Sequence, residues 1–246
     1  MGRKYANPPL VEAVCEFRFT PDTQWDMTIP GLVYEKLKDE FPRREQRLFQ
    51  EIELIQGPDG LQRQIRTSER IVFLMEDRKT FVQIGPRLLA INCLAPYPTW
   101  AGFKPKIVKA FEALMDTTDV KGLQRVGLRY INLIEIPSSQ IKLEDYFQFY
   151  LFLGPELPQV MVNFIVGCEF RYAHDRDLCR VQLITTPSGS SERPAFTLDI
   201  DYFLAQPKGI KPEEVAEWVE QAHNEIEQIF EGCITDRLRE LFQEVK

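Results

Sequence analysis

LVEAVCEFRF, residues 10–19, decides the fold because apolar and other side chains alternate along all ten positions. One side is entirely apolar and comprises Val11, Ala13, Cys15, Phe17 and Phe19. The other side comprises Glu12, Val14, Glu16 and Arg18. A period of two over this length is typical of a half-buried β-strand.

The chain after this strand predicts a helix, several strands and a second helix. Ile29-Pro30-Gly31 opens the first predicted helix, which ends before Pro42. A Gly-Pro-Asp-Gly turn at residues 57–60 joins predicted strands 48–56 and 61–68. Further strands are predicted at residues 71–75, 81–84 and 88–94, followed by a helix with Pro105 near its start.

The same order recurs in the second half of the chain. A long predicted strand covers residues 124–136, and a predicted helix runs from about Leu143 to Phe152. Strands follow at residues 160–172, 178–185 and 195–205. Pro212 opens a long amphipathic helix, and its apolar stripe continues past Gly232 as Ile234, Leu238, Leu241 and Phe242. This last stripe either completes the core or offers a docking surface, and we favour the core.

Each half therefore reads as strand, helix, several antiparallel strands and helix. We interpret this order as a tandem duplication of one α+β unit, with repeats at residues 1–118 and 119–246. The simplest assembly is one curved antiparallel sheet of about ten strands with four helices on a single face. This is the layout of the TATA-binding-protein-like, or double helix-grip, architecture, an analogy of shape based on element order.

Such a sheet leaves the opposite residues of each strand uncovered. We expect this face to carry Gln62, Gln64, Arg66 and Gln182, together with the candidate binding residues Glu12, Glu16, Arg18, Arg129, Glu169, Arg171, Arg180, Asp199 and Asp201. Two interpretations remain open. The face is either solvated, with opposite charges pairing across strands, or a concave mixed-charge cleft that binds a protein segment or a polar ligand.

The amino-acid composition excludes several classes of protein. The 246 residues include 44% hydrophobic and 27% charged residues, which is ordinary for a globular chain, and the net charge of −7 opposes a general polyanion binder. No apolar leader follows Met1, and no run approaches the roughly 18 apolar residues of a membrane span. Five scattered cysteines without a C-x-x-C pair fit a reduced, cytoplasmic protein with no metal and no cofactor.

No catalytic motif is recognisable. Glu12 and Glu16 share a strand face about 13 Å apart at ~3.3 Å per residue, too far for an acid/base couple unless cross-strand partners intervene. Asp199 and Asp201 bind a divalent cation only if a neighbouring strand adds a third ligand. His223 lies beside the apolar stripe of the last long helix, where a hydrogen-bonded structural histidine is the favoured interpretation.

Three segments resemble a known group of proteins: NPPLVEAVCEF at residues 7–17, VGLRYIN at residues 126–132, and residues 230–235. They are similar to a sporadically distributed, functionally uncharacterised family of bacterial and archaeal proteins of about this length. The resemblance spans nearly the whole chain and implies no catalytic residue. It implies mobile, accessory or antiviral defence genes, such as those of immunity or antitoxin partners.

Three hypotheses about function follow. The leading one is a non-catalytic interaction module with a protein partner, since no nucleophile with its base, metal cluster or phosphate loop is present. The second is an enzyme or small-molecule sensor that uses the polar sheet face. The third is nucleic-acid binding by the sheet, which the net charge opposes although a local arginine patch favours it.

Overall fold

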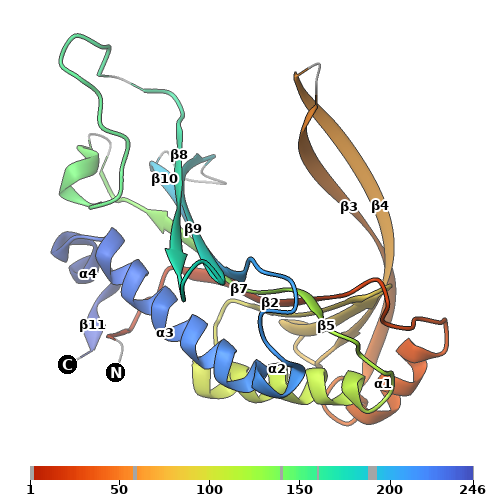
Figure 1. Ribbon diagram of the computed structural model, residues 1–246. Helices are drawn as coiled ribbons and strands as arrows, with labels where there is room; N and C mark the ends of the chain where they lie inside the picture. Colours follow the sequence, from red (N-terminus) through yellow and green to blue (C-terminus); the bar gives the residue numbers. More distant parts are fainter. Residues whose placement is uncertain (1–2, 58–59, 139–140, 160, 188–192, 246) are drawn as a thin grey trace.

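The computed structural model describes residues 3–57, 60–138, 141–159, 161–187 and 193–245, with the side chains of residues 50–67 left undescribed. Nine strands form one antiparallel sheet (Figure 1). They are β2 (Leu10–Phe19), β3 (Arg43–Gly57), β4 (Gly60–Leu74), β5 (Thr80–Gly85), β6 (Leu88–Leu94), β7 (Leu123–Glu135), β8 (Ile165–Tyr172), β9 (Asp177–Thr186) and β10 (Ala195–Leu204). Two short strands near the chain ends, β1 (Lys4–Tyr5) and β11 (Glu244–Val245), pair separately.

The strand order places β2 and β7 side by side at the centre of the sheet. The full order is β3-β4-β5-β6-β2-β7-β10-β9-β8, and every neighbouring pair is antiparallel. In each half, the first strand is central and the following strands return to it from the edge. The predicted α+β class and single antiparallel sheet are confirmed, and the predicted strands 61–68 and 71–75 are one continuous strand, β4.

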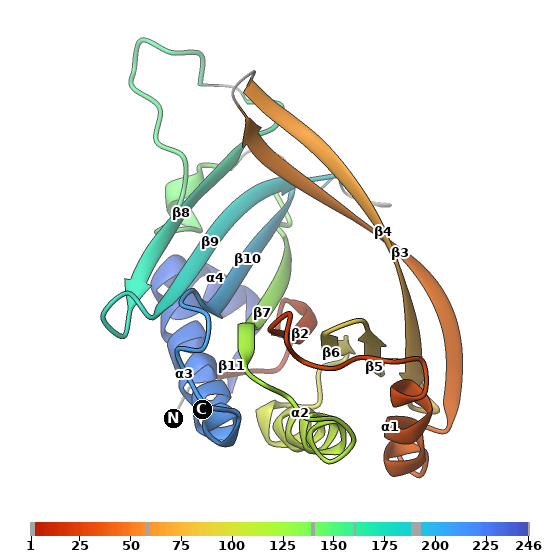
Figure 2. The same cartoon turned by 45° about the vertical axis from the view of Figure 1, so that its right-hand side comes forward.

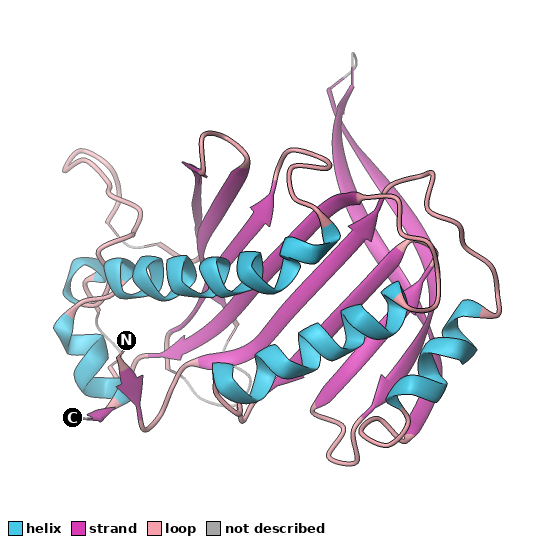
Figure 3. Ribbon diagram, turned by 60° about the horizontal axis from the view of Figure 1, so that its bottom comes forward, coloured by secondary structure: helices cyan, strands magenta, loops and turns pink. Residues whose placement is uncertain are grey.

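The helices cover one face of this sheet (Figure 3). They are α1 (Ile29–Leu37), α2 (Trp100–Met115), α3 (Val215–Cys233) and α4 (Asp236–Phe242). Helix α2 begins earlier than predicted, so Pro105 lies inside it rather than near its start and removes one backbone donor. In the described part of the chain, no helix is long and apolar enough to cross a membrane.

The alternation of β2 determines which of its sides enters the core. Ala13, Cys15 and Phe17 are fully buried beneath the helices, and Phe17 packs against Phe111 of α2 with ring centroids 4.8 Å apart. Figures 1 and 2 show that the β3–β4 hairpin and strands β8–β9 rise away from the helix layer at the two ends of the sheet. The helix-free face is therefore concave.

The predicted helix from Leu143 to Phe152 is wrong. The structure has one 3₁₀ turn, Leu143–Asp145, and the next described strand begins at Ile165. The Gln148 amide donates to the Cys233 carbonyl at 2.8 Å, and the Thr235 amide donates to the Tyr146 carbonyl at 3.0 Å. Because these groups bond to the α3–α4 connection, they cannot continue a helix.

The C-terminal apolar stripe completes the core, as favoured. Ile234, Leu238 and Phe242 are buried at 1%, 0% and 5% exposure. The chain leaves α3 at Ile234, whose φ of −115° and ψ of 153° are extended, and α4 then folds back. A docking surface on this stripe is excluded.

Candidate interaction surface on the helix-free sheet face

The nine predicted site residues lie on the helix-free face, distributed over β2, β7, β8, β9 and β10. Cross-strand partners share a face of the sheet, and Glu16 is paired with Gly127, Asp201 with Arg129 and with Arg180, and Arg180 with Glu169. Glu12 is separated from the others by its contact with β6, where its carboxylate accepts from the Asn92 amide at 2.7 Å.

Arg125 of β7, which is not among the nine predicted residues, is the centre of the charged cluster. Its Nη1 lies 3.3 Å from Glu16 Oε1, its Nη2 lies 2.8 Å from Asp201 Oδ2, and its guanidinium lies 4.8 Å from the ring centroid of Phe203. Gly127 makes this position possible, because a Cβ there would lie 2.5 Å from Arg125 Nη1. One arginine thus bridges carboxylates on both neighbouring strands.

The two carboxylates beside Arg125 have pKa values displaced in opposite directions. Burial raises the pKa of Glu16, but the hydrogen bond and charge of Arg18, followed by the charges of Arg125 and Arg70, outweigh it and lower the pKa. Burial raises the pKa of Asp201 above its ordinary value, against the attraction of Arg125 and Arg129. The same face therefore holds one carboxylate whose ionised form is stabilised, Glu16, and one that is more easily protonated, Asp201.

Arg129 and Asp199 form a second, two-point contact. Arg129 Nε lies 2.8 Å from Asp199 Oδ1, and Nη2 bonds to the other carboxylate oxygen. Asp199 is only 6% exposed, so a fully solvated face is not what the structure has at this position. Among the described residues, no group of three or more His, Cys, Asp or Glu side chains is placed to hold a metal ion.

The outer strands carry a third ion pair and two shallow hollows. Arg180 Nη2 lies 2.6 Å from Glu169 Oε1, and both side chains are more than 40% exposed. One hollow of about 460 Å³ is lined by Arg18, Arg125, Arg180 and Phe203 among others. A neighbouring hollow of about 440 Å³ is lined by Glu169, Arg171, Asp175 and Leu178.

A buried polar chain extends the surface toward the other end of the sheet. The Arg70 guanidinium donates to the Gln83 carbonyl oxygen at 3.1 Å, and the Gln83 amide donates to Asn92 Oδ1 at 2.7 Å. Asn92 in turn reaches Glu12. Arg70, Gln83 and Asn92 are each 7% exposed or less. In the sequence they are isolated polar residues, and their burial could not be predicted from it. The predicted residues Gln62, Gln64 and Arg66 have side chains outside the described set.

His223 is a structural histidine on the opposite face. Its Nδ1 lies 2.8 Å from the Tyr130 hydroxyl, its Nε2 lies 3.3 Å from Glu227, and its ring stacks on Trp100 at 4.2 Å. Burial lowers its pKa to about 4, so the ring is neutral at pH 7. The favoured interpretation of this residue agrees with these contacts.

Comparisons with known proteins add no relative to this geometry. No protein-family model, no curated protein and no solved structure matches the chain.

Proposed function

We propose that this protein is a non-catalytic interaction module that holds a partner protein against the helix-free face of its sheet. The observation that carries the proposal is the charged cluster in which Arg125 bridges Glu16 and Asp201. Its charges are fixed by ion pairs to neighbouring strands, and the described helices lie on the opposite face of the sheet. A surface of preorganised, accessible charges is suited to selecting a complementary protein surface.

Charge balance favours a protein over a nucleic acid as the partner. The nine predicted residues together with Arg125 comprise five arginines and five carboxylates. Phosphate backbones are bound by an excess of lysine and arginine, whereas these arginines already have carboxylate partners, such as Asp199 for Arg129 and Glu169 for Arg180. We therefore expect a protein partner with both charge signs, and no membrane or nucleic-acid ligand.

The resemblance of three segments to a sporadically occurring bacterial and archaeal family supports an accessory role. In such a role, the chain restrains or regulates its partner, as an immunity protein or antitoxin does. The cytoplasm is the proposed compartment, in keeping with five unpaired cysteines.

Charge reversal on this face tests the proposal. The partner is first recovered from the native host with tagged protein, identified by mass spectrometry, purified, and titrated calorimetrically. Arg171 and Arg180 are 78% and 48% exposed, so reversing both to glutamate is expected to preserve the fold and weaken binding at least about tenfold.

The matched control reverses Lys38 and Lys109 on the helix side, which are 48% and 46% exposed. These substitutions add the same charge without touching the proposed surface, so binding should persist. Equal weakening by both double variants would show that net charge alone acts, and no weakening by the sheet variant would contradict the proposal.

A second candidate function is binding of a small polar ligand. The hollow lined by Arg18, Arg125, Arg180 and Phe203 combines three guanidinium groups with an aromatic ring, and Asp201 beside it has a raised pKa. In this case the protein would be an enzyme or a small-molecule sensor. A ligand-induced rise in thermal midpoint that Arg180→Glu abolishes, without any protein partner, would favour this candidate.

We also propose that the two halves, residues 1–118 and 119–246, are repeats of one ancestral unit in a double helix-grip arrangement. The mirrored strand order around β2 and β7 supports this proposal. The second half has one strand fewer, and a 3₁₀ turn stands where the first half has α1. Superposition of residues 10–115 on residues 123–233 tests it, and halves that fail to superpose around the β2–β7 axis would contradict it.

A further inference from the structure

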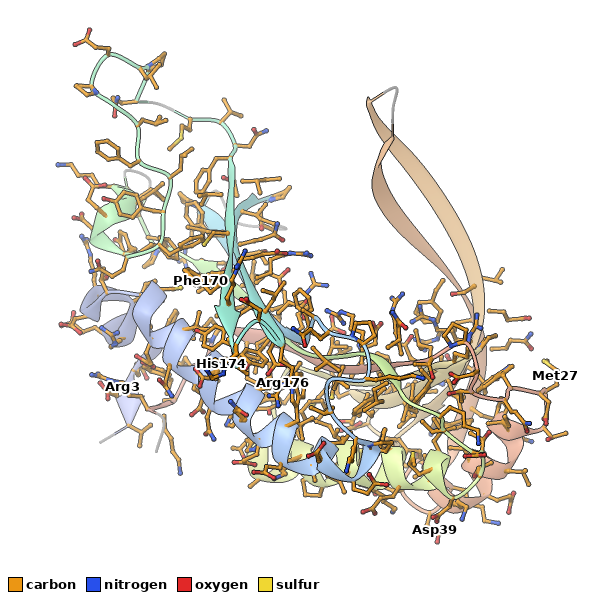
Figure 4. All side chains as sticks on the ribbon, viewed as in Figure 1. Arg3, Met27, Asp39, Phe170, His174 and Arg176 are labelled. Carbon is orange, nitrogen blue, oxygen red and sulfur yellow. The ribbon has the colours of Figure 1, made fainter. Side chains whose placement is uncertain are left out.

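Strand β8 forms one edge of the sheet, and most of its residues are exposed to solvent. Among the described strands it pairs with β9 alone, and six of its eight residues are exposed. Ile165 is 68% and Phe170 is 44% exposed, and Cys168 is the single exposed cysteine of the five. Phe170 lies on this edge strand, well away from α1 and α2 (Figure 4). Edge strands of this kind are templates for pairing with another strand.

The backbone groups at this edge follow from the register with β9. The Thr185 amide donates to the Phe164 carbonyl at 3.1 Å, and hydrogen-bonded pairs alternate along antiparallel strands. Val166, Cys168, Phe170 and Tyr172 therefore bond toward β9. The amides and carbonyls of Ile165, Gly167, Glu169 and Arg171 point to the free edge.

The side chains of β8 separate into two faces. Toward the helix layer lie Val166, Cys168, Phe170 and Tyr172, all apolar or aromatic. Val166 and Tyr172 are partly buried against the core, whereas Cys168 and Phe170 are exposed on this side. The other face carries Gly167 and the two charged residues Glu169 and Arg171.

The opposite edge of the sheet has a different character. The described part of β3 carries Arg43, Arg44 and Arg47 within five residues. Charged side chains on an edge strand oppose edge-to-edge pairing. The apolar stripe makes β8 the edge that is suited to a partner strand.

We propose that β8 pairs antiparallel with β8 of a second copy of this chain, about a two-fold axis at Cys168. This inference goes beyond the proposed function, since it concerns the edge of the sheet rather than its helix-free face. In this register the whole strand is paired, with Ile165 opposite Arg171 and Gly167 opposite Glu169 of the second copy. On the other face, Val166 meets Phe170 and Cys168 meets Cys168.

Two neighbouring registers are less favourable than this one. An axis at Glu169 would place two glutamates directly opposite, which is destabilising. An axis at Phe170 would require pairing beyond Tyr172, where Ala173, His174 and Asp175 have positive φ and the chain turns. The axis at Cys168 instead sets Glu169, already paired with Arg180, against the small Gly167.

The native cysteine provides a test of the register. Residues opposite each other at a non-hydrogen-bonded position have Cα atoms about 4.5 Å apart, within the range that a disulfide spans. Oxidation of the reduced dimer with copper phenanthroline should link the two Cys168 thiols into a covalent dimer. Cys168→Ser should abolish the link, because the other four cysteines are buried.

Light scattering and sedimentation in reducing buffer at micromolar concentration measure the association itself. The wild type should be a dimer, and Phe170→Lys should weaken association at least about tenfold by placing a charge in the apolar stripe. Leu48→Lys, on β3 and replacing a residue that is 73% exposed, is the matched control and should leave the dimer intact. If Phe170→Lys lowers the thermal midpoint, Ile165→Lys at a 68% exposed position serves instead, because it sets a like charge opposite Arg171 of the second copy.

A monomeric wild type would overturn the proposal, as would a dimer that the β8 variants leave unchanged. A dimer that Phe170→Lys separates but that Cys168 does not cross-link would overturn the register. Dissociation by the β8 variant, persistence with Leu48→Lys and cross-linking at Cys168 together would support the proposal.

Discussion

The Arg129–Asp199 pair should respond asymmetrically to removal of one partner. Arg129→Met keeps the aliphatic stem but leaves the Asp199 carboxylate, 6% exposed, without its two hydrogen bonds. Asp199→Asn leaves Arg129, whose side chain is 48% exposed, free to turn toward water. The first change should therefore destabilise the fold more than the second.

The magnitude lies between two limits. Breaking a fully buried pair costs about 3–5 kcal/mol, whereas exposed pairs contribute about 0.2–1 kcal/mol. Because Asp199 is buried and Arg129 is half exposed, we expect Arg129→Met to cost about 2 kcal/mol and Asp199→Asn less than about 1 kcal/mol. In a chain of this size, 2 kcal/mol lowers the thermal midpoint by about 4–8 °C.

Urea titration and calorimetry of the two variants provide the measurement. Arg180→Met is the control on the same face, since its partner Glu169 is 42% exposed and the expected loss is below about 0.5 kcal/mol. Equal losses in Arg129→Met and Asp199→Asn, or a loss in Arg180→Met as large as in Arg129→Met, would refute the argument from burial.

Two further predictions concern single positions. Gly127→Ala should lower the thermal midpoint although alanine is otherwise favoured in a strand, because its Cβ displaces the Arg125 guanidinium from Glu16 and Asp201; an unchanged midpoint and an unchanged Asp201 titration by NMR would contradict this. His223 has a pKa lowered by burial to about 4 against an unfolded value of about 6.5, so the unfolded chain binds more protons between these values. Stability should therefore fall by up to about 3 kcal/mol as the pH drops from 6.5 to 4, and His223→Gln should flatten this part of the pH–stability curve.

The periodicity of the sequence located the strands, although it divided β4 in two and began β8 before Ile165. It also predicted the face of strands whose side chains the structure describes. Alternation in residues 10–19 correctly assigned Ala13, Cys15 and Phe17 to the core, and the same rule placed Arg180 and Asp201 on the other face. Alternation cannot reveal cross-strand neighbours, since these depend on register. The bridging role of Arg125 required knowledge that β7 lies between β2 and β10.

Buried polar residues were the least predictable part of the sequence. Asp177 follows a polar turn and reads as solvent-exposed, yet it is fully buried and accepts from Trp218 Nε1 at 3.1 Å and from the Tyr202 hydroxyl at 3.2 Å. Arg176 completes its environment with an ion pair of 2.6 Å. Asp177 thus connects α3 to the sheet. A local sequence pattern cannot distinguish such a residue from a turn residue, because Trp218 and Tyr202 are distant from it in the chain.

The absent helix after β7 connects the fold to both proposed surfaces. The Gln148 amide donates to the Cys233 carbonyl instead of continuing the 3₁₀ turn. The segment after β7, which corresponds in chain order to α1 of the first half, therefore holds the α3–α4 connection in place. Helix α3 packs on the second half of the sheet at β7 and β10, and β8 keeps Cys168 and Phe170 exposed on its apolar side. If the edge of β8 is a contact between copies, the charged cluster around Arg125 lies on a different face and stays accessible. Binding of a partner to the helix-free face and pairing of two chains through β8 should therefore be separable, and Phe170→Lys should abolish only the second.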